Sequence, residues 1–200
     1  AFELADARRL ADELGADMLV LHVDVLSNSA VTANPSDRCY HCKNTLFRQI
    51  LRAAENDGFP VLLDGTNASD DAGDRPGMRA LRELSVRSPL RECGLTKAEI
   101  RRLSKEAGLF TWDKPAYACL ATRIRAGEEI TLQKLKQTEK AEGFLFGLGF
   151  RDFRVRMVGN TAKLELREAD LPLLLENREK IVTELRKDYD SVLLNLEVRK

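Results

Sequence analysis

Phe59-Pro60-Val61-Leu62-Leu63-Asp64-Gly65-Thr66-Asn67 gives the clearest indication of fold class in this chain. It starts as an apolar run of strand length and then passes into a polar loop. A second apolar run of this kind occupies residues 18–24, and amphipathic helices are expected at 1–15, 42–55 and 96–108. Strands that alternate with helices are typical of a parallel sheet covered by helices. The sequence therefore predicts an α/β fold with a Rossmann-like parallel sheet.

The polar loop after this strand holds the candidate nucleotide-binding residues. In an α/β protein, the loop that follows a strand is where a nucleotide binds. The loop offers a glycine for close backbone approach, hydroxyl and amide groups for a nucleotide, and carboxylates for Mg²⁺. Its members are Asp64, Gly65, Thr66, Asn67, Asp70 and Asp71. The same residue types dominate simple turns, so a turn without a ligand is an alternative.

The character of the sequence changes after about Arg125. The elements expected beyond it are a charged helix, a β-hairpin with a tight turn, another helix and a last strand, at 131–148, 153–166, 171–189 and 191–199. This order is typical of a small α+β domain. The sequence therefore predicts two domains, the α/β part at 1–125 and the α+β part at 126–200.

Composition and charge argue against several classes of protein. Lys and Arg total 32, and Asp and Glu also total 32, which does not suit a surface built as a whole for nucleic acid or anionic membrane. No apolar run reaches the length of a membrane span, and no signal peptide is visible. Four cysteines in 200 residues do not suggest a secreted disulfide framework. We therefore expect a cytoplasmic protein with no membrane or nucleic-acid partner.

Cys39 and Cys42 form a CxxC pair at the start of an expected helix. Backbone N–H groups at a helix N-terminus stabilise thiolates, and this spacing lets two thiolates reach one metal ion or cluster, or form a disulfide. Three cysteines suffice for an iron–sulfur cluster with one open iron, whereas zinc needs two ligands beyond the pair. The other Cys and His residues are His22, His41, Cys93 and Cys119. The pair alone leaves zinc, a cluster and two buried structural cysteines open.

Cys119 is a single thiol that stands between Lys114 and Arg123, whose charges can stabilise a thiolate. It also lies in an apolar piece, so a core cysteine is an equal alternative. Cys93 precedes a helix in a loop and is expected to be structural. His22 lies in an apolar run and is expected to be a core histidine.

Arg154 and Arg156 alternate on one expected strand, so both project from the same face. Two neighbouring guanidinium groups suit a phosphate or a carboxylate. A solvated face that pairs with Glu165 across the hairpin is the commoner explanation.

In combination and in this order, the motifs resemble the ATP-dependent sulfur transferases that build the nickel-pincer nucleotide cofactor of lactate racemase. Those enzymes belong to the PP-loop ATP pyrophosphatase superfamily. The matching stretches cover nearly the whole chain: Asn34-Pro35-Ser36-Asp37-Arg38-Cys39-Tyr40-His41-Cys42-Lys43, Asp64-Gly65-Thr66-Asn67-Ala68, Arg75-Pro76-Gly77, Val86-Arg87-Ser88-Pro89-Leu90, Gly94-Leu95-Thr96-Lys97, Trp112-Asp113-Lys114-Pro115, Ala118-Cys119-Leu120-Ala121 and Phe153-Arg154-Val155-Arg156.

The resemblance implies an enzyme in which ATP adenylates a carboxylate of a pyridinium dicarboxylate mononucleotide and releases pyrophosphate. Sulfur from a sulfide source then displaces AMP to leave a thiocarboxylate, and the cycle repeats on the second carboxylate. In part of the family, the cysteine matching Cys119 gives up its own sulfur and becomes dehydroalanine. Members with a CxxC instead hold a [4Fe-4S] cluster on three cysteines. Because this chain has Cys39, Cys42 and Cys119, it resembles the cluster type.

The resemblance also implies roles for residues of the second part of the chain. Arg154 and Arg156 would lie near the substrate phosphate or the subunit interface of a homo-oligomer, and Thr122 and Arg123 would face the adenylate. The acids that would bind a metal ion there are Glu142, Glu165 and Asp170. The Ser-Gly-Gly-x-Asp-Ser loop with which the family grips pyrophosphate does not occur in the 200 residues, and we expect it to precede Ala1.

Two alternatives from other classes stay open. One is a PP-loop tRNA thiolation enzyme, which also activates its substrate with ATP and can place three cysteines on a cluster. Balanced charge and the lack of an extended basic tract count against RNA. The other is a zinc-stabilised binding module with no catalysis.

Overall fold

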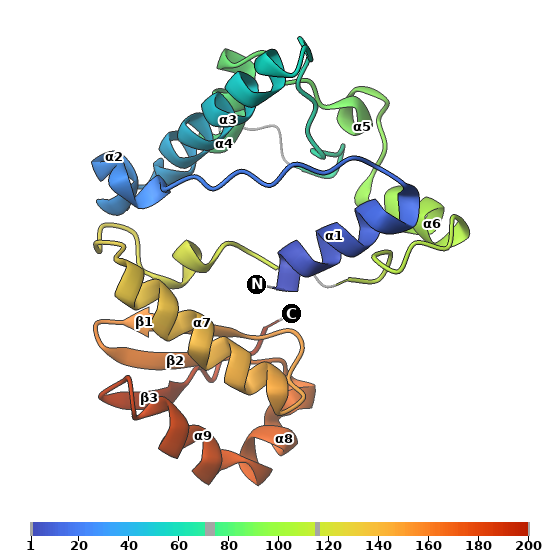
Figure 1. Ribbon diagram of the computed structural model, residues 1–200. Coiled ribbons are helices and arrows are strands. Elements are labelled where there is room, and N and C mark those ends of the chain that lie inside the picture. The colour runs from blue at the N-terminus through green and yellow to red at the C-terminus, as the bar shows by residue number, and fades with distance from the viewer. Residues whose placement is uncertain (1, 71–74, 115–116, 200) are drawn as a thin grey trace. The chain divides into compact units, whose positions relative to one another are not determined.

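The computed structural model describes residues 2–70, 75–114 and 117–199 (Figure 1). The chain forms two compact units, Ala1–Val25 with Cys39–Lys114 and Leu26–Arg38 with Pro115–Lys200. The sequence boundary at Arg125 assigned residues 26–38 to the first domain, whereas the structure places them in the second unit. Within the described residues, no helix combines the length and the apolar character that a membrane crossing requires.

The first unit is built mainly from helices. They are α1 (Phe2–Leu14), α3 (Arg38–Asn56), α4 (Pro76–Glu83), α5 (Pro89–Glu92) and α6 (Lys97–Glu106). Gly15 ends α1 in the left-handed conformation, at φ 60°, which glycine adopts without steric cost. Thr96 and Glu99 form the capping box expected at the start of α6. These local signals were therefore interpreted correctly.

The expected parallel sheet of this unit is where the prediction was wrong. Residues 16–24 form no strand, and the stretch at 59–64 makes a single isolated parallel bridge, between Leu63 and Arg87. A buried parallel strand needs hydrogen-bonded neighbours and cover on both faces. Here Leu19 is 65% exposed and Phe59 is 66% exposed, so apolar burial does not hold either segment in a sheet register. The α/β class is confirmed, but the described residues contain no Rossmann-like sheet.

The second unit carries the sheet of the structure. Its elements are η1 (Val25–Ser27, at the unit boundary), α2 (Ser29–Thr32), η2 (Leu120–Arg123), α7 (Leu132–Gly147), β1 (Arg154–Val158), β2 (Thr161–Glu165), η3 (Glu168–Asp170), α8 (Leu171–Glu176), α9 (Arg178–Leu185) and β3 (Ser191–Leu194). Strand β2 lies centrally, antiparallel to β1 and parallel to β3. The expected hairpin, charged helix and last strand are confirmed. The single helix expected at 171–189 is divided at Asn177.

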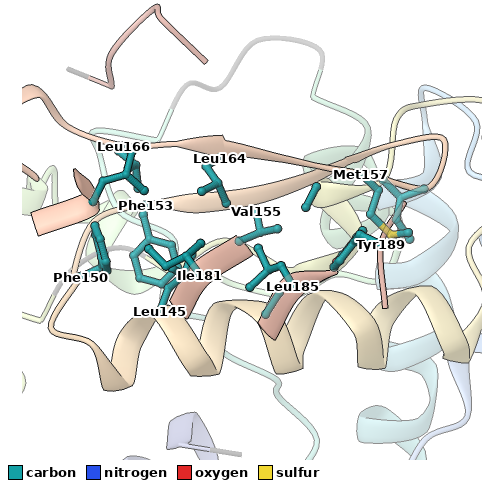
Figure 2. Packing of buried hydrophobic residues seen from close by; sticks show 14 of the residues in the cluster. Leu145, Phe150, Phe153, Val155, Met157, Leu164, Leu166, Ile181, Leu185 and Tyr189 are labelled. Carbon is teal, nitrogen blue, oxygen red and sulfur yellow. The ribbon is translucent and has the colours of Figure 1, made fainter. Parts of the chain in front are cut away.

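The core of the second unit lies between its sheet and its helices (Figure 2). Val155 of β1 and Leu164 of β2 face each other in register and are almost completely buried. Leu145 of α7 and Ile181 and Leu185 of α9 belong to the same buried cluster. Burying an aliphatic side chain of this size contributes about 1.5–3 kcal/mol each. The turn that bears Cys119 belongs to the same unit and is followed along the chain by most of the residues of this core.

Candidate functional site

A pocket of about 630 Å³ lies in the first unit, where the start of α3 meets the polar loop after residue 63. Cys39 and Lys43 line it from α3, and Asp64, Gly65 and Thr66 line it from the loop. The remaining lining residues are Phe47, Asp70, Arg75, Pro76, Gly77 and Met78. Another hollow of about 530 Å³, in the second unit beside α7, contains none of the predicted site residues. The first pocket therefore brings one predicted thiol beside the predicted nucleotide loop.

Asp64 organises the first turn of this loop through its carboxylate. Ser88 Oγ donates to Asp64 Oδ1 over 2.6 Å, and the Thr66 hydroxyl donates to Oδ2 over 2.5 Å. The Thr66 N–H also donates to Oδ1, over 3.2 Å. Burial of the carboxyl opposes ionisation, but the bonds from Ser88 and Thr66, with the charge of Lys43, hold the pKa of Asp64 below its usual value. The pocket therefore presents a carboxylate at neutral pH.

The rest of the loop is held by its own side chains. Asp70 Oδ2 accepts the Asn67 N–H over 2.9 Å, and Asn67 Oδ1 accepts the Ser69 N–H over 2.9 Å. Arg91 donates to the Asp70 carbonyl over 2.8 Å. These bonds form the turn that the sequence allowed as an alternative, with Asp70 facing the pocket. Asp71, the other predicted Mg²⁺ ligand, lies outside the described residues.

Cys39 and Cys42 are one helical turn apart in the first turn and a half of α3, so they lie on one face of the helix. Cys39 is exposed and Cys42 is half-buried. None of the four cysteines, all of which lie in described parts of the chain, forms a disulfide. Two thiols with this spacing fit two ligand positions of one iron–sulfur cluster or one zinc ion. Their burial does not support the alternative of two structural core cysteines.

Cys119 lies in the second unit, directly before η2, and its side chain is exposed. The alternative of a core cysteine is therefore wrong. Thr122 donates to the Cys119 carbonyl through both its N–H, over 2.9 Å, and its hydroxyl, over 2.7 Å. Arg123, predicted to face an adenylate, is only 1% exposed and forms an ion pair with Glu142 over 2.6 Å. Its role at a nucleotide stays a prediction.

The remaining predicted residues of the second unit are bound to protein groups. Arg156 Nε donates to Glu165 over 2.8 Å, which is the pairing across the hairpin that the sequence allowed. Arg154 is buried and donates to the Phe153 carbonyl over 2.6 Å. Burial, with the nearby charge of Arg123, lowers the pKa of Arg154. Roles of these arginines at a substrate phosphate stay predictions.

The three acids predicted to bind a metal ion each have a cationic partner. Glu142 pairs with Arg123, Glu165 with Arg156, and Asp170 with Arg167 over 2.9 Å. Searching the described residues finds no group of three His, Cys, Asp or Glu side chains placed to hold a metal ion. The metal role of each acid stays a prediction.

Several residues of the site were missed or misplaced by sequence reasoning. Ser88 and Arg75 stand in matching stretches, but nothing in the local pattern indicated that one would bind Asp64 and the other would line the pocket. Gly77 is buried, and a Cβ there would lie 3.2 Å from the Lys43 side chain, so its small size gives Lys43 room to pass. His22 is exposed in the structure, so the prediction of a core histidine was wrong.

The chain is thus an α/β protein with a CxxC beside a loop pocket in one unit and an exposed cysteine in the other. No protein-family model matches the chain. An uncharacterized protein of Synechocystis sp. is 40% identical over 82% of the chain. The pyridinium-3,5-bisthiocarboxylic acid mononucleotide synthase of Lactiplantibacillus plantarum is 33% identical over 92%, and an uncharacterized protein of Methanocaldococcus jannaschii is 33% identical over 89%.

The chain therefore belongs to the family of the pyridinium-3,5-bisthiocarboxylic acid mononucleotide synthase. The matches span 61%, 67% and 70% of the lengths of the three relatives, in the order given. The chain thus corresponds to roughly two thirds of these proteins.

Proposed function

We propose that the protein is an ATP-dependent sulfur transferase that converts the carboxylates of a pyridinium-3,5-dicarboxylate mononucleotide into thiocarboxylates. The name of the Lactiplantibacillus relative, a pyridinium-3,5-bisthiocarboxylic acid mononucleotide synthase, supports the product class. The observation that carries the proposal is the pocket that Cys39 and the Asp64–Thr66 loop line together. A thiol beside a loop suited to a nucleotide is the arrangement that sulfur transfer to an adenylated carboxylate requires.

The chemistry proceeds in two steps at each carboxylate. A carboxylate oxygen of the substrate attacks the α-phosphorus of ATP, and pyrophosphate leaves with the electron pair of the broken P–O bond. A sulfur nucleophile then attacks the acyl carbon, a C–S bond forms, and AMP leaves as the C–O bond breaks. No oxidant or reductant is needed, because the acyl carbon keeps its oxidation state. Adenylation makes the step feasible by turning a poor leaving oxygen into a good one.

In this proposal, residues of the pocket bind and orient the nucleotide. Thr66, with Asn67 next to it in the loop, hydrogen-bonds the nucleotide, and Lys43 and Arg75 offset phosphate charge. Asp64 and Asp70 hold Mg²⁺ after their present hydrogen-bond donors give way. The pyrophosphate would be bound by the PP-loop that the family resemblance leads us to expect before Ala1. Arg154 and Arg156 would bind the substrate phosphate or form part of a homo-oligomer interface.

Cys39, Cys42 and Cys119 are the proposed sulfur-handling residues. Their number and exposure fit a [4Fe-4S] cluster held by three thiolates. When bound, such a cluster would supply an iron that carries the transferable sulfide. A variant of the proposal without a cluster has Cys119 attack the acyl carbon itself and lose its sulfur by β-elimination.

The test is an anaerobic assay of the full-length protein with ATP, the pyridinium dicarboxylate mononucleotide and sulfide. We expect a thiocarboxylate product together with AMP and pyrophosphate in equal amounts, and iron with acid-labile sulfide in the purified protein. Tight, salt-sensitive binding of tRNA with no thiocarboxylate product would instead indicate the tRNA thiolation alternative. One zinc ion per chain, with no iron and no product, would indicate a zinc-stabilised binding module.

A further inference from the structure

The turn that bears Cys119 and continues into η2 is bound by side-chain hydrogen bonds. Four of its carbonyls accept hydrogen bonds from side chains. Arg123 donates to the Ala118 carbonyl over 3.4 Å, and Thr122 donates to the Cys119 carbonyl over 2.7 Å. Arg38 and Arg156 donate to the carbonyls of residues 121 and 122, over 3.0 Å and 2.7 Å. The backbone is thus held at residues 118, 119, 121 and 122, around the residue that bears the thiol.

Arg123 is the centre of this arrangement, and Glu142 of α7 holds it in place. The guanidinium is 1% exposed, and its Nε and Nη2 donate to the two Glu142 oxygens over 2.6 Å and 3.1 Å. Its third nitrogen, Nη1, donates to the Thr122 hydroxyl over 2.9 Å. A bidentate fork of this kind fixes the orientation of a guanidinium as well as its position. Arg123 therefore links helix α7 to the turn through direct hydrogen bonds on both sides.

The carboxylate of Glu142 has all its acceptor positions occupied. Besides the two bonds from Arg123, Oε2 accepts the Tyr117 hydroxyl over 2.9 Å and Oε1 accepts the Val155 N–H over 3.0 Å. A carboxylate has about four lone-pair positions, so four donors fill it. In this arrangement Glu142 has no vacant position for a metal ion. Its bonds join α7, strand β1 and both sides of Cys119, since Tyr117 precedes the thiol and Arg123 follows it.

We infer that Glu142 and Arg123 are positioning residues that hold the Cys119 thiol in its orientation for sulfur transfer. This inference rests on the proposed function. A buried ion pair is a poor source of net stability, because two apolar residues of similar volume often serve the core equally well. Its geometry, by contrast, holds the backbone that bears the exposed thiol against the second unit. Displacing a reacting group by about 1 Å can slow a reaction by about 100-fold.

The central test variant is the double replacement Arg123→Met with Glu142→Leu, which exchanges the ion pair for apolar side chains and leaves no lone buried charge. Amides of the peptide over residues 117–124 are expected to exchange with deuterium about tenfold faster than in the wild type, while peptides from β3 and α9, which make no bond to either residue, are unchanged. Thiocarboxylate formation by the full-length protein is expected to fall about 10- to 100-fold, and by more than pyrophosphate release falls.

Two more variants complete the test. Thr122→Val removes the hydroxyl that joins Arg123 Nη1 to the Cys119 carbonyl, and it should slow transfer by about threefold to tenfold. This single change leaves the buried ion pair in place, so it tests the inference even if the double variant does not fold. Lys140→Met, on the same helix, breaks an ion pair with Asp188 that does not contact the turn, and it should leave both readouts unchanged.

Faster exchange at the turn together with slower transfer would support the inference. Unchanged exchange at residues 117–124 would overturn it, because the pair would then not hold the turn. Faster exchange with transfer within about threefold of wild type would also overturn it, since order at the turn would then not matter. A wild-type protein that forms no thiocarboxylate would overturn the proposed function, while the exchange measurement would still decide whether the pair holds the turn.

Discussion

The two units differ in how their apolar residues are used. The second unit buries a contiguous cluster that includes Leu145, Phe150, Val155 and Leu164. In the first unit, the fully buried apolar side chains among the described residues are Ala80 and Leu81, while Leu19, Phe59 and Leu63 are more than half exposed. The first unit contributes the loop pocket and the CxxC, and the second contributes a rigid base with one exposed cysteine. The loop pocket and the CxxC therefore lie outside the unit that buries the contiguous core, whereas Cys119 is exposed on the unit that contains it.

The sharpest way to separate chemistry from stability is Cys119→Ala. Because the side chain is exposed, its loss removes no core packing, and we expect no detectable sulfur transfer with unchanged adenylation and an unchanged melting temperature. Thiocarboxylate and pyrophosphate are measured in the same reaction of the full-length protein. Cys93→Ala, which changes another exposed cysteine, is the matched control and should keep full transfer. Transfer retained by Cys119→Ala would refute its assigned role.

The free energy of unfolding should depend more on apolar residues of the second unit than on those of the first. Leu164→Ala opens a cavity in the core of the second unit, where this side chain is 2% exposed, and should lower the free energy of unfolding by about 2–5 kcal/mol. Leu63→Ala, at a side chain 56% exposed, should change it by no more than about 0.5 kcal/mol. Chemical denaturation followed by circular dichroism compares the two variants. Equal losses would contradict the contrast between the units.

A smaller effect is expected from the cap of α6 in the first unit. Thr96 accepts the Glu99 N–H and Glu99 accepts the Thr96 N–H, so Thr96→Ala removes half of a capping box. We expect a loss of about 1 kcal/mol and faster amide exchange confined to the first turn of α6. Faster amide exchange in β1 and β2 as well would show that the two units unfold together, and would contradict the contrast in stability between them.

The smallest expected effect concerns the ionisation of Asp64. Ser88→Ala removes a hydrogen bond that lowers the pKa of this carboxyl, so the pKa should rise in the variant. Because the folded-state pKa lies below the unfolded value, the carboxylate contributes stability that is present above the unfolded pKa and lost as pH falls through the folded pKa. The variant should therefore lose this contribution at a higher pH. An NMR titration of Asp64 measures the shift, and an unchanged pKa would contradict the assigned bond.

Local signals predicted much of the second unit, because its elements depend on nearby residues. The hairpin at 153–166 and the helix at 131–148 follow from periodicity and turn residues within single segments. The prediction of a Rossmann-like sheet was wrong, because the strands of a parallel sheet pair with partners that are far apart in sequence. Periodicity at 59–63 predicts a strand but cannot show whether another strand lies beside it.

The candidate site shows the same division. The loop residues and the thiols could be chosen by residue type, and the structure places Cys39 at the loop pocket. The pairing of Arg123 with Glu142 spans 19 residues and joins a short turn to a helix, so no local pattern indicated it. Sequence reasoning therefore identified reactive groups better than the groups that orient them.

The measurement that tests the central claim most directly is a single turnover of the anaerobically purified full-length protein with ATP, the pyridinium dicarboxylate mononucleotide and isotopically labelled sulfide. The intact mass of the polypeptide and the label in the product are read from the same sample. Our proposal predicts a labelled thiocarboxylate and a polypeptide of unchanged mass, because Cys39, Cys42 and Cys119 would hold a cluster that carries the sulfide and would not themselves be consumed. An unlabelled product with a polypeptide lighter by one H₂S would contradict the carried sulfide, and no thiocarboxylate at all would contradict sulfur transfer itself.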